Sequence, residues 1–125
     1  MPKFYIGTSG YSYQHWRGVF YPENLSQNEW FLFYTKHFNT VELNVTFYRL
    51  PFENVFRGWY KKAPKNFKFA VKGSRLITHY QKLKNIDEPL KNFFDRTLLL
   101  KEKLGAVFWQ FPASFKKDAG LLKNF

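Results

Sequence analysis

The sequence predicts an α/β protein that forms part of a TIM-like (β/α) barrel, with about four units and parallel strands. Short β-rich runs alternate four times with segments whose apolar residues recur at helical spacing. Three long loops follow strands and none precedes one, as on the active face of a barrel. A free-standing doubly wound sheet is the alternative architecture, but no GxGxxG follows the first strand.

Length and composition limit the class of protein. The 125 residues suit a single domain, 1–125, that is long enough to bury a core. The absence of cysteine excludes disulfides and thiolate chemistry and favours a reducing cytoplasm. No apolar run approaches the roughly 20 residues that span a bilayer. We therefore expect a cytoplasmic protein with no membrane partner, whose 16 Phe, 8 Tyr and 4 Trp mainly fill its core.

The chain is strongly basic, with a formal net charge of +11. Between Arg57 and Lys84 it carries nine Lys or Arg and no Asp or Glu. A polyanion such as nucleic acid would suit this run. A solvated, lysine-rich surface is the simpler interpretation, because the run lacks the regular Arg and aromatic interleaving of a single-strand binding platform. Nucleic acid therefore ranks below a small ligand as the expected partner.

The first strand is expected at residues 3–7, and the loop at residues 8–22 is too rich in Gly, Ser and aromatic residues to be helical. Gly7 and Gly10 permit backbone angles or close approaches that a side chain would block. In parallel-sheet proteins the ligand site lies beyond the carboxyl ends of the strands. The loop would carry these side chains to that site: Thr8, Ser9, Tyr11, His15, Trp16 and Arg17.

The first helix is predicted to start at a capping box of Ser26 and Glu29 and to end at Asn39. His37, in its last turn, suits the helix dipole and is interpreted as structural. Both faces of an ordinary buried parallel strand are apolar, so a polar face on the next strand, residues 40–45, indicates a polar cavity at its end. On that strand Val41, Leu43 and Val45 alternate with Glu42, Asn44 and Thr46.

The remaining elements continue the alternation of strand and helix, with an apolar stripe on each helix. In the third helix this stripe includes Leu98 and Leu104. The expected elements are a helix from Val55 to Ala63, a strand at 67–72, a loop at 73–84 and a helix that is capped by Asp87 and closed by Gly105. A strand at 106–111, packed on both faces, and a helix that begins at Asp118 complete the chain.

Five ordered motifs resemble the YecE-like family, also called domain of unknown function 72. They lie at residues 6–22, 37–51, 67–79, 88–90 and 104–112 and read IGTSGYSYQHWRGVFYP, HFNTVELNVTFYRLP, FKFAVKGSRLITH, EPL and LGAVFWQFP. The resemblance implies a barrel related in shape to the TIM barrel, and no particular reaction. Family members run to about barrel size, so we expect the N-terminal half only. Such a half would be truncated, or would pair with another chain that covers its two exposed sheet edges.

Polar side chains are expected to meet at one mouth of the barrel, provided that they point inward. The strands contribute Glu42, Asn44, Lys72 and Gln110, and the loops contribute Arg49, Arg75 and His79. A carboxylate beside an ammonium can act as a general acid or base, so Glu42, with Lys72 and His79, is the expected catalytic set. The alternative is that Glu42 and Lys72 form a buried ion pair that only braces adjacent strands.

The cations around this mouth would suit a phosphate or carboxylate, because Arg can hold such a group through two parallel hydrogen bonds. Arginines that only tie loops to backbone carbonyls are the alternative. We therefore expect a small anionic or sugar-like ligand, with a nucleic-acid-binding or nucleic-acid-processing role as the second candidate. The expected ligand-binding residues are Ser9, Tyr11, His15, Trp16, Asn44, Tyr48, Arg49, Arg75 and Gln110, with Phe47 as a further wall.

Other chemistries receive less support from the sequence. Three His without HxH or HExxH spacing, and no Cys, do not predict a metal site. The one set that could bind a metal is His15, His79 and Glu42. Ser9 and Ser74 lie on suitable loops, but no acidic residue is placed to orient a His for a Ser-His-Asp triad. The sequence names no cofactor and leaves open whether the protein is an enzyme.

Overall fold

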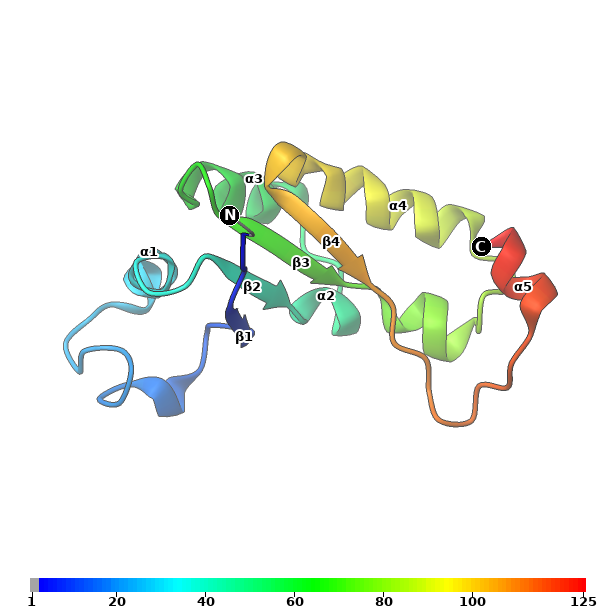
Figure 1. Ribbon diagram of the computed structural model, residues 1–125, viewed down its shortest axis with the longest axis horizontal. Coiled ribbons are helices and arrows are strands. Elements are labelled where there is room, and N and C mark those ends of the chain that lie inside the picture. Colours follow the sequence, from blue (N-terminus) through cyan, green and yellow to red (C-terminus); the bar gives the residue numbers. More distant parts are fainter. Residues whose placement is uncertain (1–2) are drawn as a thin grey trace.

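Four parallel strands form one sheet in a mixed α/β fold (Figure 1). The computed structural model describes residues 3–125, so the first two residues of the expected domain lie outside it. The strands pair in the order β1-β2-β3-β4, each beside the strand that precedes it in the chain. They are β1 (Gly7–Ser9), β2 (Thr40–Leu43), β3 (Lys68–Lys72) and β4 (Leu104–Phe108). The predicted alternation of parallel strands and helices is therefore confirmed.

Helical segments connect the strands. They are α1 (Trp30–Thr35), α2 (Val45–Tyr48), α3 (Glu53–Lys62), α4 (Asp87–Thr97) and α5 (Ala119–Asn124), with 3-10 turns at Gln14–Trp16, Gln27–Glu29 and Leu98–Lys103 and a π-helix at Leu76–Tyr80. Within residues 3–125, every helix is too short or too polar to cross a bilayer.

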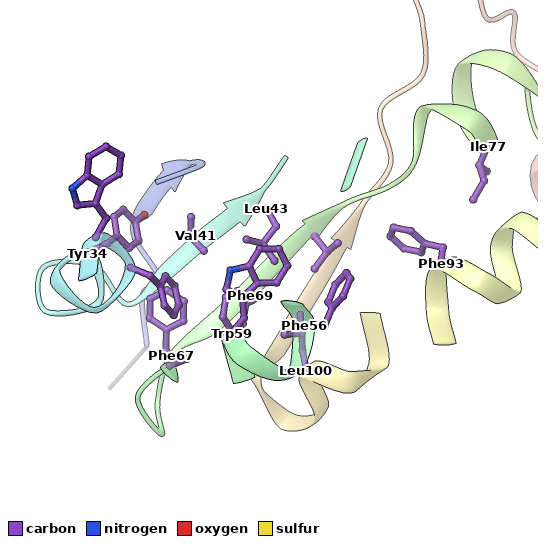
Figure 2. Packing of buried hydrophobic residues seen from close by; sticks show 14 of the residues in the cluster. Tyr34, Val41, Leu43, Phe56, Trp59, Phe67, Phe69, Ile77, Phe93 and Leu100 are labelled. Carbon is purple, nitrogen blue, oxygen red and sulfur yellow. The ribbon is translucent and has the colours of Figure 1, made fainter. Parts of the chain in front are cut away.

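The sheet has one covered face and one open face. Val41, Leu43 and Phe69 point from their strands into an apolar cluster with Phe56 and Trp59 of α3 (Figure 2). Helices α3 and α4 lie along this side of the sheet in Figure 1. Side chains in the alternate positions of β2 and β3 are only partly buried. The described residues therefore bury one face of the sheet and leave the other accessible.

The accessible face corrects one expectation. The fourth strand was expected to be apolar because both of its faces would be packed. Instead Gly105 and Ala106 are exposed and Phe108 is 47% exposed, while Val107, on the helix side, is half-buried. Apolar side chains on β4 thus contact solvent where only one layer of helices covers the sheet.

The Tyr34 hydroxyl adds a side-chain link between the first two strands, beside their backbone pairing. The Tyr34 hydroxyl accepts a hydrogen bond from the Thr8 amide at 2.8 Å and donates one to the Thr40 carbonyl at 2.8 Å. The strands approach so closely that a Cβ on Gly7 would lie 1.9 Å from the Thr40 carbonyl oxygen. The close approach requires glycine at this position.

The first strand begins later than predicted. Residues 3–6 precede β1, because the Asn39 side chain takes the hydrogen bonds that a neighbouring strand would make. Its amide donates to the Phe4 carbonyl at 2.7 Å, and its oxygen accepts from the Ile6 amide at 2.8 Å. Regular pairing starts only at Gly7, opposite Thr40.

The second strand ends earlier than predicted. The expected alternation fails at Val45, which is 43% exposed, and at Thr46, which is fully buried. The chain turns into α2 at Asn44, so these side chains follow helical rather than strand geometry. The Thr46 hydroxyl lies 2.9 Å from the Leu43 carbonyl oxygen and 2.6 Å from that of Lys72, and it fixes α2 against β3. The loop expected at 73–84 likewise contains the π-helix.

Two of the predicted helix caps are wrong and one is confirmed. Ser26 makes no side-chain cap, and its backbone oxygen accepts from Glu29 in a 3-10 turn. Asp87 is the first residue of α4 rather than its cap. Asp118 caps α5 as predicted, since its carboxylate accepts from the Leu121 amide at 2.9 Å.

The third helix ends differently from the prediction. Gly105 lies in β4, and the chain leaves the helical region at Lys101, which has a φ of 51°. Leu98, expected in the buried stripe, is 58% exposed, and Leu104 starts β4. The buried Lys103 ammonium donates to the Tyr60 and Ala63 carbonyls at the end of α3, both at 2.7 Å. This lysine satisfies helix-end carbonyls that would otherwise lack donors.

Replacing Tyr34 by Phe tests the link between β1 and β2. The variant should lose about 1–3 kcal/mol of unfolding free energy, because the Thr8 amide and the Thr40 carbonyl lose their partner. Urea unfolding followed by circular dichroism measures the loss. Tyr5→Phe, at a partly exposed ring, is the control and should change stability by less than about 0.5 kcal/mol. Equal effects of the two substitutions would contradict this account of the strand link.

Candidate functional site

The carboxyl ends of the strands form the candidate site, together with α2 and the π-helix (Figure 1). We call this region the mouth. The strand register places Ser9 beside Glu42, and Glu42 beside Ala70. Lys72 lies two residues further along the same face of β3. Ser9, Glu42 and Lys72 thus share the open face of the sheet, as the alternation of the sequence predicted.

Gln110 departs from this arrangement. It follows the end of β4 by two residues and is exposed. It therefore lies beyond the sheet, in the chain segment that leads to α5, rather than on a strand beside Lys72.

Phe47 of α2 organises two of the cations. The Lys72 ammonium nitrogen lies over the Phe47 ring, 4.3 Å from its centroid. The His79 ring meets the same phenyl ring nearly edge-on, with 5.0 Å between centroids. The Nδ1 atom of His79 lies 2.8 Å from the Thr78 hydroxyl, which leaves the Nε2 atom for another partner. An aromatic face attracts a cation, so Phe47 holds Lys72 without using its N–H donors.

Arg75 is held by two further rings. Its guanidinium carbon lies over Tyr48 of α2, 5.4 Å from the ring centroid, and over Tyr80 of the π-helix at 5.5 Å. Its N–H groups have no acceptor among residues 3–125. Two segments far apart in the sequence thus orient one guanidinium and leave its donors free. We call Lys72, Arg75 and His79 the cationic cluster.

Within residues 3–125, no acidic side chain forms an ion pair with the cationic cluster. The ion pairs in the described part of the chain are Arg57–Glu53 at 3.2 Å and Lys91–Asp95 at 2.7 Å, both on exposed helix surfaces. The alternative of a buried Glu42–Lys72 ion pair is therefore wrong for this part of the chain, and both side chains are only partly buried. A cluster of oriented cations without carboxylate partners is suited to an external anion.

A separate polar group lies at the ends of β1 and β2. The Asn44 amide nitrogen lies 3.4 Å from the Ser9 hydroxyl and 3.3 Å from that of Tyr13. The Tyr13 hydroxyl donates to the Ser9 carbonyl at 2.5 Å. Gly10 permits this contact, because it has a φ of 77° and a Cβ there would lie 2.3 Å from the Tyr13 hydroxyl. The sequence analysis missed Tyr13, which no spacing signal separates from its aromatic neighbours.

Tyr11 lies deeper in the protein than a residue that only lines the mouth. The Trp59 indole donates to its hydroxyl at 2.9 Å, and the Tyr21 hydroxyl donates to its carbonyl at 2.5 Å. Burial raises the pKa of Tyr11, and the Trp59 hydrogen bond offsets part of that rise. Tyr11 and Trp59 line a hollow of about 300 Å³ that also includes Asn44, and a second of about 360 Å³ between α1 and α3. Trp59 is a further residue that the sequence analysis assigned only to the core.

The other predicted site residues lie at the edge of the mouth. His15 is exposed, with its ring 5.4 Å from that of Tyr13, and Trp16 packs on Tyr13 at 4.9 Å. Arg49, at the end of α2, is exposed. No group of three or more His, Asp or Glu side chains in residues 3–125 is placed to hold a metal ion.

The fold and the mouth define the class: a parallel α/β protein with polar side chains at the carboxyl ends of its strands. The chain belongs to the family described as Protein of unknown function DUF72, whose model matches residues 5–125. The expected YecE-like resemblance is thereby confirmed. The UPF0759 protein YecE of Escherichia coli K12 is 34% identical over 82 residues, which are 66% of this chain and 30% of YecE. YunF of Bacillus subtilis is 29% identical over 117 residues, 89% of this chain and 40% of YunF.

Solved structures of the family share the fold. A DUF72 family protein from Thermotoga maritima matches with a TM-score of 0.78 and 34% identity, over 95% of this chain and 48% of that one. One from Enterococcus faecalis matches with a TM-score of 0.66 and 23% identity, over 79% of this chain and 43% of that one. The chain thus spans about half, or less, of the length of these relatives.

The buried tyrosines predict a loss of stability at alkaline pH. Burial raises the pKa values of Tyr11, Tyr21 and Tyr34, and hydrogen bonds to Thr8 offset part of the rise at Tyr34. In the unfolded chain tyrosine titrates near pH 10. Above about pH 10 the unfolded state therefore binds fewer protons than the folded state, and the unfolding free energy falls as pH rises. Below that pH the contribution is complete.

Absorbance at 295 nm and circular dichroism, recorded together from pH 8 to 12, measure this effect. We expect the buried tyrosines to ionise only as the dichroism of the fold disappears. Ionisation of all 8 tyrosines with the dichroism intact would disprove it.

Proposed function

We propose that the mouth binds a small anionic or sugar-like ligand and that the cationic cluster holds its anionic group. The supporting observation is that Lys72 and Arg75 are each oriented by aromatic rings, and His79 by a ring and a hydroxyl, while no carboxylate in the described residues pairs with them. Their orientation is set before a ligand arrives, which lowers the entropy that binding must overcome.

Each member of the cluster offers a different donor. Arg75 can grip two oxygens of a phosphate or carboxylate through parallel hydrogen bonds, and Lys72 contributes a compact charge. His79 offers Nε2 as a donor in the tautomer whose Nδ1 accepts from the Thr78 hydroxyl. Arg49, exposed at the end of α2, is a further cation at this end of the sheet. Together these groups suit one phosphate or carboxylate group.

Hydroxyl and amide groups bind the sugar-like part of the ligand in this proposal. Ser9, Asn44 and Tyr13 form a hydrogen-bonded group at the ends of β1 and β2, and His15 and Trp16 lie next to Tyr13. Such groups donate to and accept from neutral hydroxyls. In this proposal the ligand spans from these residues to the cationic cluster, with Tyr11, Tyr48 and Gln110 as contacts at its margins.

For a ligand that is transformed as well as bound, we assign the general acid or base to Glu42. Its register beside Ser9 and on the face of Lys72 supports this role. Lys72 and His79 would stabilise developing negative charge. The proposal leaves the reaction itself open.

We further propose that the four strand-helix units form an N-terminal half of a closed barrel in a cytoplasmic protein. The support is the sequential order of four parallel strands, the helices on one face only and the absence of cysteine. Four more units, from a continuing or a separate chain, would cover the open face and both sheet edges.

Removal of one cation from the cluster tests the anion site. Arg75→Gln and Lys72→Gln should each weaken binding of inorganic phosphate about tenfold or more, because a charge-assisted hydrogen bond is lost. Isothermal titration calorimetry measures the affinity. Lys61→Gln is the matched control, because it removes the same charge from the last turn of α3, away from the mouth. Equal weakening by all three substitutions would indicate general charge attraction and contradict a defined site.

The alternative of a nucleic-acid-binding protein is supported by the acid-free run from Arg57 to Lys84. In the fold this run is divided. Lys61, Lys62 and Lys65 precede β3, whereas Lys72 and Arg75 follow it, so the cations lie at opposite ends of the sheet. The division favours a compact site. The affinity for phosphate should therefore fall only mildly with added salt, whereas a labelled oligonucleotide that binds with a steep salt dependence would support the alternative.

Glu42→Gln tests whether Glu42 is structural. We expect the unfolding free energy to change by less than about 0.5 kcal/mol, because no cation lies within ion-pairing distance of Glu42 in residues 3–125. Phosphate affinity should be kept or improved, since a nearby negative charge is removed. A stability loss of about 3 kcal/mol would instead restore the ion-pair interpretation.

A further inference from the structure

We infer that the anionic ligand of the mouth is a nucleoside phosphate, with its phosphate on the cationic cluster and its base stacked on Tyr48 or Tyr80. The inference rests on the proposed function, because it names the class of ligand for the same site. It is carried by the two aromatic rings that hold Arg75 rather than by the cations themselves.

Both rings are largely exposed. Tyr48 is 61% exposed and Tyr80 is 65% exposed. Neither hydroxyl has a hydrogen-bond partner among the described residues. Tyrosines elsewhere in the chain, such as Tyr21 and Tyr34, are buried and hydrogen-bonded. Large exposed rings at a polar mouth are typical of a binding surface.

Contacts with neighbouring side chains hold both rings in position. Arg75 lies over both, at 5.4 Å from Tyr48 and 5.5 Å from Tyr80. Tyr48 also meets Phe47 edge-to-face, with 5.0 Å between centroids and 89° between planes. A guanidinium covers one face of a ring at most, so each tyrosine retains a face for another planar group. Two flat apolar surfaces thus border one anion-binding group.

The cations Lys72 and Arg75 indicate what the planar group is attached to. Phe47 carries Lys72 at 4.3 Å and is the ring next to Tyr48 in the chain. An anion on Lys72 and Arg75 would therefore lie beside the ring of Tyr48. A nucleotide joins a phosphate to a flat aromatic base through one sugar, and base stacking on a tyrosine is a common mode of binding. A phosphorylated sugar without a base would leave the exposed faces of both rings without a stacked aromatic partner.

A single nucleotide fits these features better than a strand. Strand-binding surfaces track many phosphates along a charged groove with successive aromatic platforms. Here the exposed tyrosines share one arginine, and the remaining lysines of the basic run lie partly at the other end of the sheet.

Four probes test the inference on the full chain by isothermal titration calorimetry: inorganic phosphate, ribose 5-phosphate, adenosine and adenosine 5′-monophosphate. The monophosphate should bind about 5- to 100-fold more tightly than ribose 5-phosphate, as expected for one stacked base. Because both rings also orient Arg75, Tyr48→Leu or Tyr80→Leu should weaken binding of both phosphates, but should weaken the monophosphate more and so reduce this advantage. Tyr48→Phe and Tyr80→Phe keep the rings and should keep the advantage, and Tyr5→Leu, outside the mouth, is the matched control. Circular dichroism verifies that each variant is folded.

The outcomes separate the inference from the function on which it rests. If phosphate and ribose 5-phosphate bind but the nucleotide binds no more tightly, the inference is overturned and the anion site stands. If none of the phosphorylated probes binds, the proposed function fails as well. An oligonucleotide that binds far more tightly than the mononucleotide, with a steep dependence on salt, would also overturn the inference.

Discussion

The alternation of side chains along two parallel strands determines where the chemistry of this protein can lie. On β2 and β3, every second side chain is buried in the helix-covered core. These side chains are Val41, Leu43, Phe69 and Val71. A one-residue shift in register would exchange these side chains with polar ones, at a cost of several buried apolar groups. Glu42 and Lys72 are therefore held on the open face by the packing of their neighbours. The core thus sets the face of the sheet on which these two side chains lie.

A second constraint concerns how the cations are oriented. Proteins commonly fix Lys and Arg with carboxylates, which also neutralise them. Here aromatic rings orient the cations without neutralising their charge. Phe47 orients Lys72, and two tyrosines orient Arg75. The charges of Lys72 and Arg75 thus remain without carboxylate partners in residues 3–125. This arrangement connects the high aromatic content of the chain with its basic charge.

Much of the fold could be predicted because it depends on local patterns. The four strand-helix units, the approximate position of α3, the Asp118 cap and the shared face of Glu42 and Lys72 all follow from periodicity and cap chemistry. The turn at Asn44 could not be predicted, because the alternation of polar and apolar residues continues past it. Only the buried bonds of Thr46 to the Leu43 and Lys72 carbonyls reveal why the strand stops.

The residue types of the candidate site could be predicted from the sequence, but the contacts among these residues could not. Sequence reasoning paired Glu42 with Lys72, because adjacent strands carry opposite charges. In the fold, Lys72 extends toward Phe47, and Ser9, Tyr13 and Asn44 form their own group. Which ring meets which cation depends on the π-helix, a segment that propensity assigns to a loop.

Crystals soaked in selenate and measured at the selenium absorption edge test the central claim most directly. An unneutralised cationic cluster should bind the anion, with selenate oxygens within hydrogen-bonding distance, about 2.7–3.2 Å, of the Arg75 guanidinium and the Lys72 ammonium, and with the anomalous peak at the selenium atom that these oxygens surround. Carboxylates paired with these two side chains, together with no peak at the mouth, would contradict it.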